Sequence, residues 1–469
     1  MFPTVTLDAA RARHWDMIIA GSSFSAMFFL KGLPRDLDVL ILEKGRHITH
    51  ADQIATGFRN REELPQINTS DHPKDWVFHS LLGGNSNCWW ACTPRFHPSD
   101  FRMNTLYGVG EDWPVDYDTL EPFYLEVERA MDINGGGSDA HLPRSAPFPY
   151  PAHLPTRSDR KMRAHSDMWW AQPSARANGG DRPWCCSNGV CDECPIDSKY
   201  TVINSIERLA HPGAHLLMET EVRAVRTEAG RATGVRVRSA GAEAEIAGSA
   251  VALGANAVFN AAILMRSGLD HPRLGRGLNE QLAQTIVVDG PGLGYFGGTS
   301  VTGHGYALYD GAHRADHSGV LMEIHNAPPL LRKEPGKWTD RMIIKLIAED
   351  LPRDENRVTL VDDEVQIEWA GHDPYAWDGI AWGMETAPSI LPDDLEVRGF
   401  FPPVDSEKHA MGTHPFGPDP ARHLCDDTHR VHGTDNLFAL GSGAFPTTSP
   451  ANPTLTLSAL ALRAGRSVT

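Results

Sequence analysis

DMIIAGSSFSA, residues Asp16–Ala26, contains the clearest indication of the fold of this chain. Its first part, Met17–Ala20, is apolar and uncharged, as is typical of a buried strand in a parallel sheet. A glycine turn and an apolar, helix-like stretch to Leu33 follow. A second apolar segment at 38–42 then ends at Glu43. This order predicts a strand–helix–strand unit of a doubly wound α/β domain.

The turn of this unit is similar to a dinucleotide-binding turn. The usual G-x-G-x-x-G pattern stands here as G-x-S-x-x-A, and serine and alanine are small enough for close approach to a pyrophosphate. The acidic Glu43 favours an unphosphorylated ribose, and therefore FAD or NAD over NADP. An ordinary strand–turn–helix is the alternative. The candidate cofactor residues of the unit are Gly21, Ser22, Ser23, Phe24, Ser25, Ala26 and Glu43.

Composition narrows the class of protein. A chain of 469 residues with 41% hydrophobic residues is long enough for two or three lobes. It has no run of eighteen apolar residues and no secretion signal in its first twenty residues. We therefore expect a cytoplasmic protein, with export together with a partner subunit as the open alternative. The formal net charge of −17 disfavours nucleic acid and anionic membranes as partners.

Further segments resemble the glucose-methanol-choline (GMC) flavin oxidoreductases and follow the order of that family. LLGGNSNCWWACTPRF (Leu81–Phe96) is similar to its flavin-contacting segment, and WPVDYDTLEPFY (Trp113–Tyr124) to a tryptophan-proline start of a helix. VALGANAVFNAAILMRSG (Val251–Gly268) resembles the strand and helix that close its nucleotide domain. VHGTDNLFALGSGAFPTTSPANPTLT (Val431–Thr456) resembles its C-terminal signature. Within the family, bacterial FAD-dependent sugar dehydrogenases and pyranose oxidases are the most similar.

The resemblance implies a domain organisation. The fold is expected to be α/β, or α+β overall, with a discontinuous Rossmann-like FAD-binding domain built from residues 1–134, 200–277 and 405–469. Residues 278–404 contain alternating, strand-like segments and are expected to form an antiparallel-sheet substrate-binding domain. Residues 135–199 are expected to form a loop or cap that contains a cluster of cysteines.

The resemblance also implies a reaction. It predicts an FAD-dependent dehydrogenase that oxidises a hydroxyl of a sugar, glycoside or related polyol by hydride transfer to flavin N5. The family's histidine of H-x-x-G-T falls on His409, and its residue before proline falls on Asn452. A base takes the hydroxyl proton and a second polar group holds the hydroxyl, and histidine suits the first role because its pKa lies near neutrality. His414 is the reserve candidate.

The resemblance places more of the FAD site outside the first unit. In pyranose oxidases, a histidine at the position of Cys88 bonds covalently to the flavin. A thioether to Cys88 and an unreactive buried cysteine are the two alternatives here. The implied FAD residues are Gly84, Asn87, Cys88, Val222, Gly441, Ser442, Asn452, Pro453 and Thr454.

Four of the seven cysteines fall within ten residues, namely Cys185, Cys186, Cys191 and Cys194. In a chain without a secretion signal, such crowding favours metal ligation over disulfides. The double cysteine and the final Cys-Pro resemble the loop that holds an iron–sulfur cluster in bacterial sugar dehydrogenases of the family, although the last gap is one residue shorter. The sequence therefore predicts a [3Fe-4S] or [4Fe-4S] cluster at these cysteines, with zinc, a disulfide or free thiols as alternatives.

A cluster would pass electrons from reduced flavin to an external acceptor or a small accessory subunit. Two other functions stay open on the sequence. An oxygen-dependent alcohol or pyranose oxidase has the same fold, and the absence of a cluster would favour it. A non-redox lyase that contains flavin is the third reading, and the cysteine cluster disfavours it because a lyase has no use for an electron relay.

Overall fold

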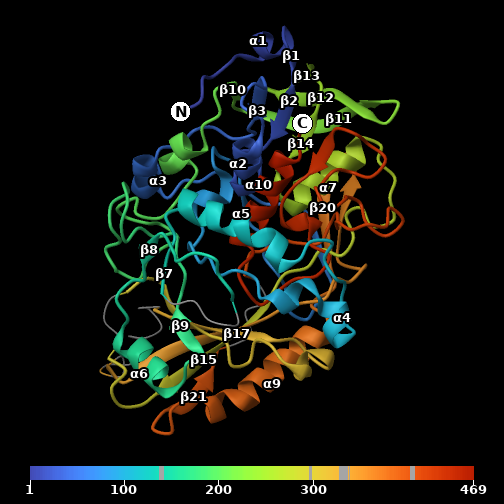
Figure 1. Ribbon diagram of the computed structural model, residues 1–469. Helices are drawn as coiled ribbons and strands as arrows, with labels where there is room; N and C mark the ends of the chain where they lie inside the picture. The colour runs from blue at the N-terminus through green and yellow to red at the C-terminus, as the bar shows by residue number, and fades with distance from the viewer. Residues whose placement is uncertain (137–141, 295–297, 327–335, 337–338, 402–406) are drawn as a thin grey trace.

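Five parallel strands form the central sheet of the upper half of the molecule in Figure 1. Their spatial order is β10 (Ala214–Leu217), β3 (Val39–Leu42), β2 (Met17–Ala20), β14 (Val251–Leu253) and β22 (Leu437–Ala439). In chain order this is 3-2-1-4-5, the order of dinucleotide-binding domains. Apart from His215 in β10, the strand residues are apolar, as expected where both faces of a sheet are covered. The predicted α/β fold is confirmed.

The computed structural model describes residues 1–136, 142–294, 298–326, 336, 339–401 and 407–469. Parts of the predicted cap (137–141) and of the third FAD-domain segment (405–406) lie outside the described residues. Within the described ranges, no helix combines the length and the apolar character needed to span a membrane.

Helices cover one face of the parallel sheet. They are α2 (Phe24–Gly32), which follows β2 directly, and α10 (Thr454–Arg466) and α5 (Tyr117–Ala130), which pack beside it. The helices α2 and α10 approach closely at Gly32 and Gly465, because a Cβ at Gly465 would lie 2.2 Å from the Phe29 carbonyl oxygen. The two ends of the chain therefore meet in one layer beneath the sheet, as Figure 1 shows.

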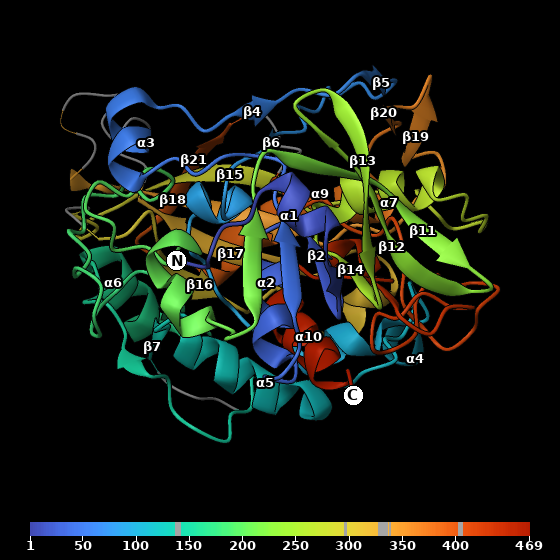
Figure 2. The same cartoon turned by 90° about the horizontal axis from the view of Figure 1, so that it is seen from above.

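A second, four-stranded sheet lies beside the first. It consists of β1 (His14–Trp15), β13 (Ala242–Gly248), β12 (Arg231–Ser239) and β11 (Thr220–Glu228), and the last three form an antiparallel meander. Figure 2 shows this meander to one side of β2 and β14. Helix α7 (Asn256–Arg266) follows β14 and packs on β11.

A six-stranded antiparallel sheet forms the lower half of the molecule in Figure 1. One face of this sheet is apolar and packs on helix α9 (Pro374–Ile390). The sheet face and the helix together form a second hydrophobic core. The edge strand β9 comes from the predicted cap rather than from residues 278–404. The strand order is β21 (Glu396–Phe400), β15 (Leu282–Asp289), β18 (Arg341–Ala348), β17 (Val320–His325), β16 (Val301–Gly305) and β9 (Trp169–Ala171).

The segment Asn356–Trp369, expected within this sheet, forms a separate hairpin instead. Its strands β19 (Arg357–Val361) and β20 (Glu364–Trp369) pair with β5 (Gln66–Asn68) in a three-stranded sheet. The alternating pattern predicted the strands correctly, but alternation does not specify which sheet a strand joins. The domain boundaries themselves stay a prediction.

Short elements connect these layers. They are the helices α1 (Leu7–Arg11), α3 (His50–Thr56), α4 (Met103–Tyr107) and α6 (Arg157–His165), and the strands β4 (Arg61–Glu62), β6 (Phe78–His79), β7 (Asn134–Gly135) and β8 (Tyr150–Pro151).

Candidate active site

A cavity of about 830 Å³ opens at the carboxyl ends of the parallel strands. Ligands of open α/β sheets bind at this edge. Six of the residues predicted from the sequence line the cavity together, although they come from four separate parts of the chain. These are Gly21, Ser22, Ser23, Glu43, Gly84 and Val222.

Gly21 forms the tight turn between β2 and α2. Its φ is +92°, a conformation that favours glycine, and a Cβ there would lie 2.6 Å from the Gly254 carbonyl oxygen. The following helix has Ser23 as its N-cap with no side-chain cap bond and no acidic residue in its first turn. Its free backbone N–H groups are therefore available to an anion such as a pyrophosphate. The residues present fit a dinucleotide.

Glu43 is buried at the end of β3 and is held from two sides. Ser22 Oγ donates to one carboxylate oxygen at 2.5 Å, and the Gly45 N–H donates to the other at 2.7 Å. Burial raises the pKa of the Glu43 carboxyl, and these two hydrogen bonds act in the opposite direction. The acid thus stands in the cavity wall beside the turn, where an adenosine ribose would lie.

The remaining predicted residues of the first unit, Phe24, Ser25 and Ala26, make packing contacts next to the turn. Phe24 packs edge-on against Trp89 at 4.7 Å between ring centroids, which joins α2 to the predicted flavin-contacting segment. A Cβ on Gly441 would contact Ser25 Oγ at 3.4 Å, and one on Gly254 would lie 2.8 Å from the Ala26 Cβ. Only small residues allow these approaches.

Asn87 and Cys88 do not line the cavity. The Asn87 amide is used within the protein, because it donates to the Leu82 and Gly84 carbonyls and accepts from Gln53. The Cys88 thiol lies 3.5 Å from His79 Nδ1, and burial raises its pKa. A raised pKa disfavours the thiolate, so the structure adds nothing in favour of a thioether at Cys88.

His409 lies between the two halves of the molecule. Its Nδ1 is 2.8 Å from Gln281 Oε1, immediately before β15 of the six-stranded sheet. Burial lowers the pKa of the His409 imidazole, while the carboxylates of Glu407, Glu280 and Glu323 act in the opposite direction. The ring is therefore held neutral in the range where a base is useful.

Asn452 is brought near this histidine through the same glutamine. Gln281 Nε2 donates to the Ser449 and Ala451 carbonyls, at 2.8 Å each, and Ala451 directly precedes Asn452. Asn452 Oδ1 is buried without a hydrogen-bond partner among the described residues. Such an atom is costly to leave unpaired and fits a position facing a bound ligand.

Other predicted C-terminal residues form the backbone around these two side chains. Ser442 Oγ donates to the Ala410 carbonyl at 2.7 Å, so the Gly441–Ser442 turn supports the segment that carries His409. Pro453 and Thr454 begin α10.

The reserve candidate His414 does not belong to the site. It is fully buried against Gly443, and burial lowers its pKa to about 3.

A row of mostly polar side chains crosses the six-stranded sheet in register. Trp170, His304, Glu323, Lys345 and Thr285 are successive cross-strand partners on the face opposite α9. Glu323 contacts His304 at 3.3 Å. Together these residues form a polar wall opposite the parallel sheet.

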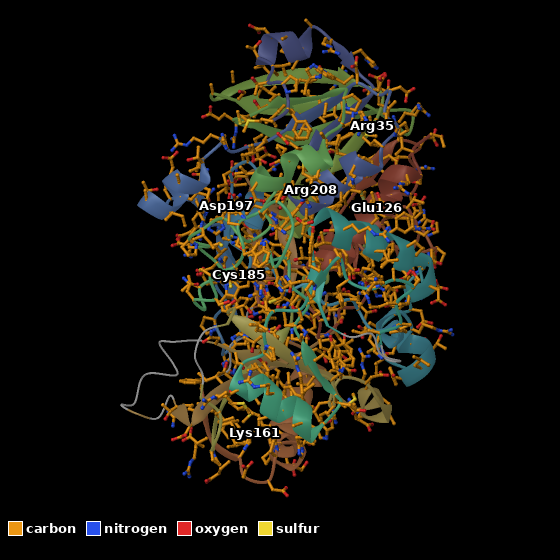
Figure 3. The ribbon with its side chains drawn as sticks, turned by 60° about the vertical axis from the view of Figure 1, so that its left-hand side comes forward. Arg35, Glu126, Lys161, Cys185, Asp197 and Arg208 are labelled. Carbon is orange, nitrogen blue, oxygen red and sulfur yellow. The ribbon has the colours of Figure 1, made fainter. Side chains whose placement is uncertain are left out.

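The four clustered cysteines are not arranged as a metal site. All are free, and no group of three or more metal-ligating side chains is assembled among the described residues, which include Cys185–Cys194 in full. Cys191 is turned inward, where Arg176 Nη1 donates to its thiol at 3.1 Å, whereas Cys186 is exposed. Figure 3 shows Cys185 between the halves, above Lys161 of α6. The structure thus differs from the predicted set of four metal ligands.

Several cavity residues were not predicted. Lys44, His79, Asn256, Phe259 and Arg266 line it together with the predicted ones. The sequence contained a signal for Asn256, because a polar residue soon after the carboxyl end of a parallel strand is a common ligand position. No comparable signal marks Phe259 or Arg266, which reach the cavity from α7.

Comparison with known proteins identifies chains that are similar to this one. Residues 352–461 match the GMC oxidoreductase family. The chain is 25% identical over 439 residues to the fructose dehydrogenase large subunit of Gluconobacter japonicus, covering 82% of this chain and 80% of that protein. It is 27% identical over 522 residues to the 6'''-hydroxyparomomycin C oxidase of Streptomyces lividus, covering 97% and 91%.

Solved structures show the same fold. Pyridoxine 4-oxidase from Mesorbium loti superposes with a TM-score of 0.68 at 16% identity, over 97% of this chain and 99% of that chain. Formate oxidase from Aspergillus oryzae superposes with a TM-score of 0.68 at 14% identity, over 97% and 98%. With the family match to its C-terminal part, the relatives and the fold, the chain is identified as a GMC-type, FAD-dependent oxidoreductase that acts on CH–OH groups.

Proposed function

We propose that this protein is an FAD-dependent dehydrogenase that oxidises a hydroxyl group of a sugar, glycoside or related polyol, with His409 as the base. The names of three relatives refer to fructose, hydroxyparomomycin C and C-glycosides, which supports a sugar-like substrate. The hydrogen bond between His409 Nδ1 and Gln281 Oε1 is the observation that carries the role of His409. It uses one ring nitrogen and leaves Nε2 for the substrate.

Alcohol oxidation removes a proton from oxygen and a hydride from carbon. When bound, FAD supplies the hydride acceptor at flavin N5. His409 Nε2 takes the hydroxyl proton, which requires a neutral imidazole, and burial of the ring favours that form. The Asn452 amide holds the same hydroxyl and so keeps its carbon in a fixed orientation.

Residues at the carboxyl ends of the parallel strands would hold the cofactor. The turn Gly21–Ser23 at the start of α2 would hold the pyrophosphate, and Glu43 would bind the ribose hydroxyls. The polar wall offers a carboxylate and an ammonium to a polyhydroxylated ring, through Glu323 and Lys345. His325, whose Nε2 lies 2.8 Å from Glu323 Oε2, adds an imidazole beside the wall. A sugar presents several hydroxyls that can both donate and accept hydrogen bonds to such groups.

The test is anaerobic mixing of the flavin-loaded protein with a panel of sugars, methyl glycosides and C-glycosides, followed by the loss of flavin absorbance. At least one member should bleach the flavin. His409→Ala should slow this bleaching by about 10²–10⁴-fold while flavin content stays at the wild-type level. His313→Gln, a substitution far from the site, should behave as wild type. Unchanged bleaching in His409→Ala would reject His409 as the base.

An oxygen-dependent oxidase is the second candidate, since two relatives that each cover 97% of the chain are named as oxidases. Turnover with a reducible dye and with oxygen, measured on the same preparation with the same sugar, separates the two. Faster turnover with the dye supports the dehydrogenase, and comparable or faster turnover with oxygen supports the oxidase. The name of another relative as a large subunit raises an accessory subunit as an electron partner.

The iron–sulfur relay stays a prediction from the sequence, and no step of the proposed mechanism passes through it. The described thiols do not converge on one point, because Cys191 bonds to Arg176 and Cys186 faces solvent. Iron and acid-labile sulfide analysis of protein purified without oxygen tests it. Three or four iron atoms per chain would establish a cluster, and only trace iron would reject the predicted cluster.

A further inference from the structure

We infer that Gln281 is a positioning residue for His409, which it holds in the tautomer with the proton on Nδ1 and the lone pair on Nε2. This inference rests on the proposed role of His409 as the base. It assigns to a residue 128 positions away in the chain the task of presenting the correct nitrogen to the substrate.

The hydrogen-bond pattern of Gln281 determines which way its amide faces. Its other contacts are the carbonyl oxygens of Ser449 and Ala451, at 2.8 Å each. A carbonyl can only accept, so the amide nitrogen must point at these two atoms. The amide oxygen therefore faces His409, at 2.8 Å from Nδ1, and accepts from it. Because Nδ1 is the donor, the neutral ring has its lone pair on Nε2.

The backbone places the two side chains opposite one another. Asn279 and Met411 form an antiparallel bridge with two backbone hydrogen bonds, of 3.1 and 3.0 Å. Gln281 lies two residues after Asn279, and His409 lies two residues before Met411. The antiparallel register therefore places Gln281 and His409 opposite one another. Gln281 directly precedes β15, which is paired on both sides by β18 and β21. The acceptor therefore stands immediately before a strand that is paired on both sides.

Glu280, which lies between Asn279 and Gln281, contacts the backbone that directly precedes His409. Its carboxylate accepts from the Lys408 N–H at 3.1 Å and forms an ion pair with the fully buried Lys74. Lys408 has a φ of +62°, which is unfavourable for a residue with a Cβ. The hydrogen bond to Glu280 stabilises this conformation and so sets the direction in which the next residue, His409, projects.

The same contact serves both protonation states of the base. When His409 Nε2 accepts the hydroxyl proton, Nδ1 still donates to Gln281, and the bond becomes charge-assisted. The charged groups near the ring are Glu407, Glu280, Glu323 and Lys345. They remain when Gln281 is changed, so an effect of its substitution reports on the contact and not on the surrounding charge.

The first experiment measures the tautomer directly. The holoenzyme is labelled with ¹⁵N-histidine, and the His409 signals are identified by their absence in His409→Asn. We expect a protonated Nδ1 and an unprotonated Nε2 in the wild type. Gln281→Met, which removes donor and acceptor at similar volume, should give a mixture of tautomers. An Nε2-protonated wild type would overturn the inference, whether or not any variant folds.

The second experiment measures function by anaerobic bleaching of the flavin with the most active sugar of the panel. Gln281→Met should lower the maximal bleaching rate by roughly 10–100-fold with unchanged flavin content. Gln281→Glu keeps an acceptor and adds a negative charge, so it should move the acidic limb of the rate profile to higher pH. Gln284→Met, three residues further along and within β15, is the matched control and should resemble the wild type.

The two proposals fail in different ways. A single Nδ1-protonated tautomer in Gln281→Met, with an unchanged pH profile, would reject the positioning role while leaving His409 as the base. Normal bleaching in His409→Ala would reject the base, even where the ¹⁵N signals follow Gln281 as expected.

Discussion

The thiol of Cys191 accepts a hydrogen bond from the guanidinium of Arg176 at 3.1 Å, and both side chains are buried. Ser300 N–H donates to the same sulfur at 3.3 Å, just before β16. Burial raises the pKa of a thiol, but here Arg176 and Ser300 outweigh it and the pKa of Cys191 is lowered. The contact attaches the cysteine cluster to the edge of the six-stranded sheet.

We therefore expect Cys191→Ala to destabilise the protein by about 1–3 kcal/mol, since a buried guanidinium loses one of its partners. Cys186→Ser, at an exposed position, should change the free energy of unfolding by less than about 0.5 kcal/mol. Urea unfolding under reducing conditions measures both. Equal stabilities of the two variants would contradict the structural role of Cys191.

Gly21→Ala should abolish FAD binding. The new Cβ would lie 2.6 Å from a backbone oxygen at a φ of +92°, and backbone atoms cannot move aside cheaply. Gly268→Ala is the matched control, because its φ is +78° but nothing lies within 4 Å. The Gly268→Ala variant should lose about 1 kcal/mol of unfolding free energy and still bind FAD. Flavin absorbance per chain after purification measures the result, and full flavin in Gly21→Ala would show that the turn can relax.

The rate of flavin bleaching should depend on pH through His409. Burial lowers the pKa of its imidazole from the usual 6.5, and the base acts only when neutral. The rate should therefore be flat above about pH 6.5 and fall tenfold per pH unit below the lowered pKa. Stopped-flow measurements from pH 4.5 to about 8 test this. A rate limb centred above pH 7 would show that another group is the base.

Asn452→Ala should slow flavin bleaching by about 10²-fold with unchanged flavin content. Its amide oxygen is buried without a partner among the described residues, as expected for a group that contacts bound substrate. Asn452→Asp tests the polarity of the contact at the same volume. If both variants bleach at the wild-type rate, the Asn452 amide has no part in the reaction.

Acid should destabilise the fold through buried neutral histidines. Burial lowers the pKa of His429 to about 4, whereas an unfolded histidine titrates near 6.5. The unfolded chain thus binds the proton first, so stability is full above about pH 6.5 and is lost as pH falls toward 4. The loss from His429 amounts to about 3 kcal/mol. His414 contributes in the same direction.

His429→Phe keeps the ring that stacks on Phe416 and removes the titration. The free energy of unfolding in urea should then depend less steeply on pH between 4 and about 6.5 than in the wild type. Parallel pH curves for the two proteins would show that His429 does not carry the effect.

Much of the fold was readable from short-range patterns. The unit from Met17 to Glu43, the strands around Val222 and the alternation in 278–404 all rest on local periodicity and turn chemistry. The cofactor turn was equally readable, because close backbone approach needs small residues at fixed positions. Local patterns did not show that β9 would join the six-stranded sheet, or that β19 and β20 would leave it.

The residue types and spacing in the chain identified the nucleotide turn and Glu43 as candidates, and the resemblance to the GMC family added His409 and Asn452. Their partners came from folding alone: Gln281 meets His409 across 128 residues, and Arg176 donates a hydrogen bond to Cys191. Such pairings depend on strand register and on which buried donors find acceptors, and these are properties of the packed chain as a whole.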